Sequence, residues 1–98
     1  MLTSKQRAHL RSIAQSYSCI FYVGKNGIGD ELINQLEAAI NSRELIKVGV
    51  QENCDYTARE AADEIAAQLG ADVVQVIGRR FVLFRRNPEE PKIELPRR

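Results

Sequence analysis

Residues 57–84 read TAREAADEIAAQLGADVVQVIGRRFVLF, and this stretch contains the signal for one complete helix followed by the signal for one hairpin. Thr57 and Glu60 have the spacing of a capping box, in which each side chain binds the backbone N–H of the other residue at the start of a helix. Apolar residues then recur at helical spacing until Gly70, which is a typical C-terminal stop. The pattern predicts a helix over residues 58–69.

The second part of the stretch contains two runs rich in β-branched and aromatic residues, 73–77 and 81–84. Only Gly78, Arg79 and Arg80 separate the two runs. Because a connection this short joins neighbouring strands as a hairpin, we expect the last two strands to be antiparallel.

Towards the N-terminus, the sequence repeats the alternation of helix and strand. We expect a helix over residues 4–15 that starts with a Thr3/Gln6 capping box, followed by a buried strand over 19–23. Asp30 is expected to cap a second helix that ends near residues 41–42. A half-exposed strand over 45–50 should follow, with Ile46, Val48 and Val50 on one side and Lys47 on the other. A full helix between consecutive strands is typical of parallel crossovers in one sheet. The expected fold class is therefore α/β, a compact two-layer domain with the order α-β-α-β-α-β-β.

Length and composition set the expected domain limits. With 98 residues, of which 44% are hydrophobic and 28% charged, the chain is expected to form one globular domain over residues 1–87. Residues 88–98 contain three prolines and are expected to form an extended, basic, partly mobile tail. No apolar run approaches the roughly 18 to 20 residues that cross a bilayer, and the N-terminus does not resemble a signal peptide. We expect a cytoplasmic protein without a membrane partner, and a monomer.

The net charge of +1 hides a segregation of charge along the chain. Residues 1–29 carry four basic and no acidic side chains, residues 30–72 carry three basic and ten acidic, and residues 73–98 carry seven basic and three acidic. A polyanion responds to the local potential, so this chain can bind nucleic acid although it is nearly neutral overall. Random scatter of surface charge remains the alternative on charge alone.

The segment Gly24-Lys25-Asn26-Gly27 lies between an expected strand and the start of an expected helix. Free N–H groups and the positive end of the helix dipole favour an anion there. The two glycines let a sugar-phosphate chain approach the backbone, and Lys25 adds a positive charge. Gly-x-x-Gly loops of KH domains bind RNA backbone in this way. A tight turn at Asn26-Gly27 without any ligand is the alternative.

Further basic residues extend this candidate surface. Lys5, Arg7 and Arg11 lie on the first expected helix, and Arg79 and Arg80 lie at the hairpin, where basic residues can also serve only to protect a sheet edge. The strand aromatics are expected to lie in the core rather than to stack on bases: Phe21, Tyr22, Phe81 and Phe84.

The sequence offers no constellation for catalysis or for a metal ion. His9 is the only histidine, and Cys19 and Cys54 do not have the spacing of metal ligands. We expect no enzymatic activity and no cofactor. A second function class stays open, a protein-interaction module in which the acidic middle helices contact ribosomal proteins and the glycine loop is only a turn.

Five blocks of the sequence resemble a known family. They are LTSKQR at residues 2–7, VGKNG at 23–27, ELIKV at 44–48, VQVIGR at 74–79 and KIELPR at 92–97. Together they resemble the bacterial YhbY-type proteins, the stand-alone form of the chloroplast RNA splicing and ribosome maturation (CRM) domain. Residues 51–56 match nothing that we can assign in this family.

The resemblance implies a mixed four-stranded sheet similar to that of the C-terminal domain of translation initiation factor three. It also implies a ribosome assembly factor that associates with precursors of the large ribosomal subunit, so ribosomal RNA is the expected partner. The family's RNA contacts are carried over to Gly24, Lys25, Asn26 and Gly27, and to the neighbouring basic surface of Lys5, Arg7 and Arg11.

Overall fold

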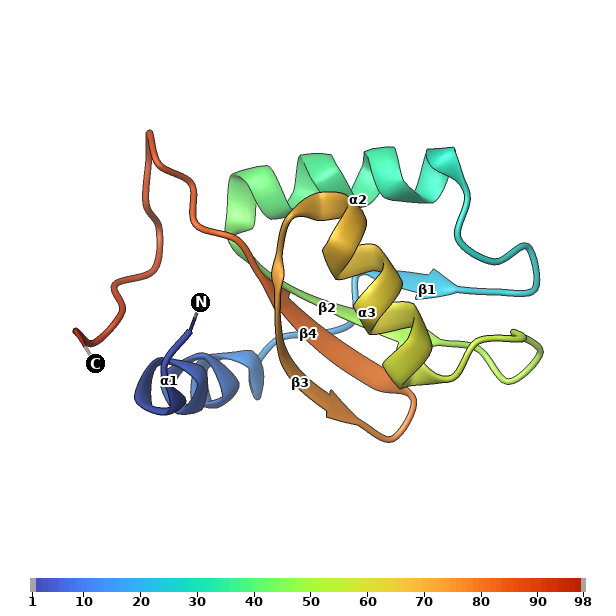
Figure 1. The fold of residues 1–98 in the computed structure, drawn as a ribbon, viewed down its shortest axis with the longest axis horizontal. Helices are drawn as coiled ribbons and strands as arrows, with labels where there is room; N and C mark the ends of the chain where they lie inside the picture. The colour runs from blue at the N-terminus through green and yellow to red at the C-terminus, as the bar shows by residue number, and fades with distance from the viewer. Residues whose placement is uncertain (1, 98) are drawn as a thin grey trace.

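Three helices and four strands alternate along residues 2–97, the part of the chain that this computed structural model describes (Figure 1). In chain order they are α1 (Ser4–Ala14), β1 (Phe21–Val23), α2 (Asp30–Arg43), β2 (Leu45–Val50), α3 (Ala58–Leu69), β3 (Asp72–Ile77) and β4 (Arg80–Phe84). The predicted order of elements is confirmed, and each predicted boundary lies within about two residues of the observed one, the usual uncertainty of an element's end.

The ends of α1 and α3 follow from the local sequence. Thr57 Oγ1 accepts the Glu60 N–H at 3.1 Å, and the Thr57 N–H donates to Glu60 Oε1 at 2.9 Å. Thr3 and Gln6 form the same capping box at the start of α1. Gly70 ends α3 in the left-handed conformation, with φ of 65°. Because a side-chain cap contributes about 1 kcal/mol, these helices begin where the sequence predicts.

The start of α2 differs from the prediction. Its N-cap is Gly29, which has no side chain to accept a hydrogen bond, and Asp30 is the first helical residue. The prediction that Asp30 caps this helix is therefore wrong. Asp30 and Glu31 instead lie in the first turn, where carboxylates interact favourably with the helix dipole.

The strands form one mixed four-stranded sheet, as expected, in the order β1-β2-β4-β3. β1 is parallel to β2, and β4 is antiparallel to both β2 and β3. The predicted hairpin between the last two strands is confirmed. β4 lies between β2 and β3, so the crossover through α3 connects two strands that run in the same direction without being neighbours.

Helices cover both faces of the sheet (Figure 1). On one face, α2 and α3 enclose a core that includes the strand residues Ile46, Val48, Val50, Phe81 and Leu83. On the other face, α1 encloses a smaller core that includes Leu45, Val74, Val82 and Phe84. The domain thus has three layers instead of the two expected. β2 is buried on both sides instead of half-exposed, because α1 covers the face that carries Leu45.

The tail, residues 88–97 of the described chain, forms no helix or strand and runs back towards α1 (Figure 1). Ile93 and Leu95 pack against the core under α1, and Gln6 Nε2 donates a hydrogen bond to the Pro96 carbonyl at 2.9 Å. Residues 88–98 contain three basic and three acidic side chains. The expectation of a basic tail is therefore wrong by count, and the positive charge of the C-terminal third comes from the arginines at both ends of β4.

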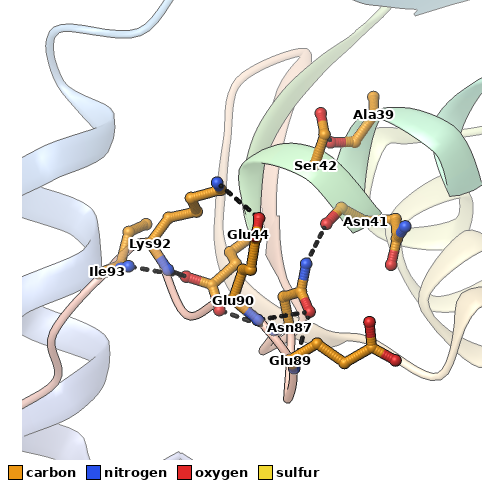
Figure 2. Close-up of polar contacts among 9 residues, drawn as sticks. All are labelled: Ala39, Asn41, Ser42, Glu44, Asn87, Glu89, Glu90, Lys92 and Ile93. Carbon is orange, nitrogen blue, oxygen red and sulfur yellow. Dashed lines mark hydrogen bonds and ion pairs between the residues drawn. The ribbon is translucent and has the colours of Figure 1, made fainter.

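Glu44, which follows α2, holds this tail in place (Figure 2). Its carboxylate is fully buried and accepts the backbone N–H groups of Asn87, Lys92 and Ile93 at 2.7, 2.6 and 2.7 Å. Burial raises the pKa of Glu44, but the three N–H donors and the nearby Arg86 outweigh burial and lower the pKa below its ordinary value. Glu44 also adopts a φ of 66°, a conformation that favours glycine, so its side-chain contacts offset a backbone cost.

Candidate nucleic-acid interface

The segment Gly24–Gly27 forms a tight turn between β1 and α2. The Gly27 N–H donates to the Gly24 carbonyl at 2.9 Å, and Gly27 has a φ of 73°, which favours glycine. Lys25 and Asn26 lie at the tip of the turn and are exposed. The turn proposed as the alternative is thus present, and it directs a lysine outward. Because the Gly27 amide closes the turn, it is not free to bind an anion.

The segment after β2 supports this turn. A Cβ atom on Gly24 would lie 2.6 Å from Gln51 Oε1, and one on Gly27 would lie 3.6 Å from Tyr56 Cε2. Gln51 and Asn53 line the same groove as the turn, and their amide groups can donate and accept hydrogen bonds there. No role could be assigned to this segment from the sequence, because only the parallel pairing of β1 and β2 brings it beside the turn.

The hairpin arginines lie at the same end of the sheet as the turn. The Gln51 N–H donates to the Val23 carbonyl at 2.9 Å, and the Val50 N–H donates to the Arg79 carbonyl at 2.7 Å. The end of β1, the end of β2 and the hairpin therefore lie next to one another at one end of the sheet, and together they form one edge of it. With strands about 4.8 Å apart, β1 and β4 are separated by roughly 10 Å at this end of the sheet.

The charges along this edge are mixed. Lys25, Arg79 and Arg80 are exposed, and within residues 2–97 none of them forms an ion pair or a side-chain hydrogen bond. The groove beside the turn is also lined by the carboxylates of Asp30 and Glu31, which already lie at the positive end of the α2 dipole. The start of α2 is thus less favourable for an anion than expected, and phosphate is favoured on the side of Lys25 and the hairpin.

The basic residues of α1 lie elsewhere. Lys5, Arg7 and Arg11 belong to a helix that covers the other face of the sheet from α2 and α3, at the end of the long axis opposite the Gly24–Gly27 turn (Figure 1). The structure therefore brings the hairpin to the turn but does not bring α1 to it. Any RNA contact by α1 would involve a separate surface or a longer RNA.

One strand aromatic is exposed. Phe81 and Phe84 are buried and Phe21 is half-buried, so the expectation of core positions is confirmed for these, but Tyr22 is 56% exposed. Tyr22 lines the groove beside the turn and also the groove formed by residues 50–53. The expectation that Tyr22 belongs to the core is wrong. Its strand, β1, is an outermost strand of the sheet, and its side chain projects beyond the area that α1 covers.

Two other polar groups have structural partners. Arg85 forms a forked ion pair with Glu37, with its Nη1 and Nη2 at 2.8 and 2.6 Å from the two carboxylate oxygens, and its Nη1 also donates to the Leu69 carbonyl. The hydrogen bond from Arg85 lowers the pKa of Glu37 against a smaller effect of burial. The Tyr56 hydroxyl lies 3.3 Å from both oxygens of Glu64, and burial together with this carboxylate raises the pKa of Tyr56. These groups link α2, β4 and α3, and we assign them no ligand.

Among residues 2–97, no three His, Cys, Asp or Glu side chains are grouped as metal ligands would be. Within the same range, no helix combines the length and the apolar character that a bilayer crossing requires.

The chain is similar to several known proteins. A sequence model described as the CRS1/YhbY (CRM) domain matches residues 2–85. The probable RNA-binding protein YqeI of Bacillus subtilis is 42% identical over 96 residues, which cover 98% of this chain and 100% of that protein. An RNA-binding protein of Haemophilus influenzae is 35% identical over 97 residues, covering 99% of this chain and 97% of that protein.

A solved structure agrees with the fold. The solution structure of SAV1595 from Staphylococcus aureus, described as a hypothetical protein and a candidate RNA-binding protein, has a TM-score of 0.74 and is 40% identical, covering 98% of this chain and 100% of that one. The family model spans every helix and strand described above, and this structure shares their arrangement. The chain therefore belongs to the CRS1/YhbY (CRM) domain family.

Proposed function

We propose that this protein binds RNA through the Gly24–Gly27 turn and the hairpin arginines, and that it acts as an assembly factor on precursors of the large ribosomal subunit. One observation carries the proposal. Lys25, Arg79 and Arg80 are exposed, have no ion-pair partner among the described residues, and lie along one edge of the sheet. Such an unpaired basic edge suits a sugar-phosphate backbone, because each phosphate contact releases condensed counterions.

The size of the edge fits a short length of backbone. The strands that lead into the turn and out of the hairpin, β1 and β4, are two strand spacings apart in the sheet, or roughly 10 Å. The carboxylates of Asp30 and Glu31 on the α2 side repel phosphate and so restrict it to the Lys25 side. The relatives that carry the name RNA-binding protein support RNA as the partner.

The salt dependence of RNA binding tests the first part of this proposal. The ligand is a transcript of one domain of the large-subunit ribosomal RNA, titrated between about 50 and 200 mM salt. Lys25→Ala and Arg79→Ala should each lower the slope of log affinity against log salt by about one, because each removes one phosphate contact. Arg59→Ala is the matched control, since Arg59 is exposed on α3 and pairs with Asp63. Unchanged slopes for both test variants would overturn the assignment of the site.

The assembly role is tested in cells. A tagged form of the full chain should sediment with immature large subunits on ribosome gradients and leave those fractions after ribonuclease treatment. The Lys25→Ala variant should shift towards the top of the gradient. Association that survives ribonuclease but is lost in an Asp63→Lys variant would favour the alternative, in which the acidic helices contact a ribosomal protein.

A further inference from the structure

The exposed end of the sheet carries four residues in one row, one from each strand. Tyr22 pairs with Gly49, Gly49 pairs with Arg80, and Arg80 pairs with Ile77. Residues that are paired in register project to the same face of a sheet. The row therefore places a tyrosine, a glycine, an arginine and an isoleucine side by side across all four strands.

This row lies on the face that α1 covers, but beyond the end of α1. Arg80 alternates along β4 with Val82 and Phe84, and both of these are buried in the core under α1. Tyr22 and Ile77, in contrast, are 56% and 62% exposed, the two large hydrophobic side chains with the greatest exposure in the described chain. The α1 face is thus covered at one end and open at the other.

The position of the Tyr22 ring is set by Gly49. A Cβ atom on Gly49 would lie 2.6 Å from Tyr22 Cε1 and 2.7 Å from Tyr22 Cδ1, so this edge of the ring lies against the backbone of β2 where a side chain is missing. One edge of the ring therefore contacts the sheet, and more than half of the residue's surface remains in solvent. An aromatic ring fixed in this way loses little conformational entropy when it binds a flat partner.

The charges around the ring favour a nucleotide over a neutral ligand. Lys25 and Tyr22 line the same groove, and Arg80 lies in the same row as Tyr22 about two strand spacings, or roughly 10 Å, away. Both cations lack an ion-pair partner among the described residues. Glu52, in the second groove that Tyr22 lines, and the carboxylates of α2 would repel phosphate. An RNA strand is therefore directed from the turn, across Tyr22, towards the hairpin.

We infer that Tyr22 is a base-stacking residue, and that this protein recognises unpaired RNA by placing one nucleobase on the exposed side of the Tyr22 ring while the Gly24–Gly27 turn and Arg80 contact the flanking backbone. The inference rests on the proposed RNA-binding function and adds the class of RNA. A base that is stacked and paired within an A-form helix has no free face for the Tyr22 ring, whereas an unpaired base has one. The structural alternative is that Tyr22 only shields Gly49.

Substitution of Tyr22 separates these two roles. The probes are an unstructured RNA of about ten nucleotides and a duplex RNA that contains the same sequence. Tyr22→Leu should weaken binding to the single strand by about 5- to 140-fold, since stacking on an aromatic ring contributes about 1–3 kcal/mol per base and 1.4 kcal/mol is a factor of ten. Tyr22→Phe, the matched control, should change it by less than about threefold, and neither variant should change duplex binding by more than that. Equal single-strand affinity for the Leu and Phe variants would overturn the inference.

A second measurement covers the case in which Tyr22→Leu destabilises the fold. In the unmodified protein, the ring protons of Tyr22 should shift upfield in NMR spectra when the single-stranded RNA is added, because a stacked base shields them. Absence of this shift at saturating RNA would also overturn the inference. Lys25→Ala separates the two proposals: if it weakens binding while Tyr22→Leu does not, stacking fails and RNA binding by the turn stands, and if neither variant weakens binding, the proposed function fails as well.

Discussion

Replacing Glu44 by glutamine should destabilise the whole domain, although Glu44 lies far from the candidate RNA site. The buried carboxylate accepts three backbone N–H groups, two on Oε1 from Lys92 and Ile93 and one on Oε2 from Asn87. Glutamine keeps one oxygen acceptor, so its NH₂ group must face at least one of these N–H donors. An unsatisfied buried donor costs about 1–3 kcal/mol, and the remaining hydrogen bonds lose the gain of roughly 1 kcal/mol that a charged acceptor provides.

The expected loss is therefore about 2–4 kcal/mol in the free energy of unfolding, which for a domain of this size lowers the Tm by at least about 8 °C. Thermal and urea unfolding followed by circular dichroism measure this loss. Glu90→Gln is the matched control, because Glu90 forms only an exposed ion pair with Lys92 at 3.5 Å. Hydrogen exchange gives a local measurement, since the amides of Asn87, Lys92 and Ile93 should lose protection. A Glu44→Gln protein that melts within about 2 °C of the unmodified one, with these amides still protected, would refute the reasoning.

Three further outcomes follow from the same structure. Because folding lowers the pKa of Glu44, the contribution of its carboxylate to stability should be fully present above the ordinary pKa of 4.5 and should be lost as the pH falls through the lower folded pKa. In urea unfolding, the stability difference between the unmodified and Glu44→Gln proteins should therefore shrink at acid pH. Gly27→Ser should lower the free energy of unfolding by about 1–2 kcal/mol, because Gly27 has a φ of 73°. Gly29→Ser, at a φ of −104°, should instead stabilise α2 by a few tenths of a kcal/mol, because serine supplies the missing N-cap hydrogen bond. Equal effects of the two substitutions in thermal unfolding would contradict both assignments. Arg85→Ala should cost about 1–2 kcal/mol, since its forked ion pair is partly buried, while Arg59→Ala should cost less than about 0.5 kcal/mol; a double-mutant cycle with the acidic partner of each arginine measures the pair.

The elements that sequence predicts well are those that depend on neighbours within a few residues. The capping boxes at Thr3 and Thr57 and the stop at Gly70 are local interactions, so the start of α1 and both bounds of α3 follow from them. The hairpin is equally local, because its short connection leaves one way to join the strands. The start of α2 shows the limit, since Gly29 and Asp30 are both acceptable N-caps and sequence alone does not decide between them.

The arrangement of these elements depends on contacts between distant parts of the chain. Nothing in the sequence of β4 indicates that it pairs with β2 as well as with β3. The sequence of β2 likewise does not show that α1 covers its second face, on which Leu45 lies, and so forms a third layer. The pairing of β4 with β2 brings Arg79 to the edge that contains the Gly24–Gly27 turn, while the basic residues of α1 lie at the other end.

The candidate site was predicted in part. The turn with Lys25 at its tip is local and could be located from sequence, but the exposure of Tyr22 depends on its partner Gly49 in another strand. The roles of Gln51 and Asn53 in lining the groove depend on the same parallel pairing. A glycine opposite an aromatic residue is a signal that can be recognised once the register is known.

The tie between Glu44 and the tail bears on where this domain can be cut. The match to the family model ends at residue 85, and every N–H group that binds the Glu44 carboxylate comes from a residue beyond that point. A protein shortened at the family boundary would lose all three of these N–H donors, together with Ile93 and Leu95, which pack against the core under α1. Any expressed, fused or tagged form of this protein should therefore include the residues up to Pro96, whose carbonyl accepts a hydrogen bond from Gln6 of α1.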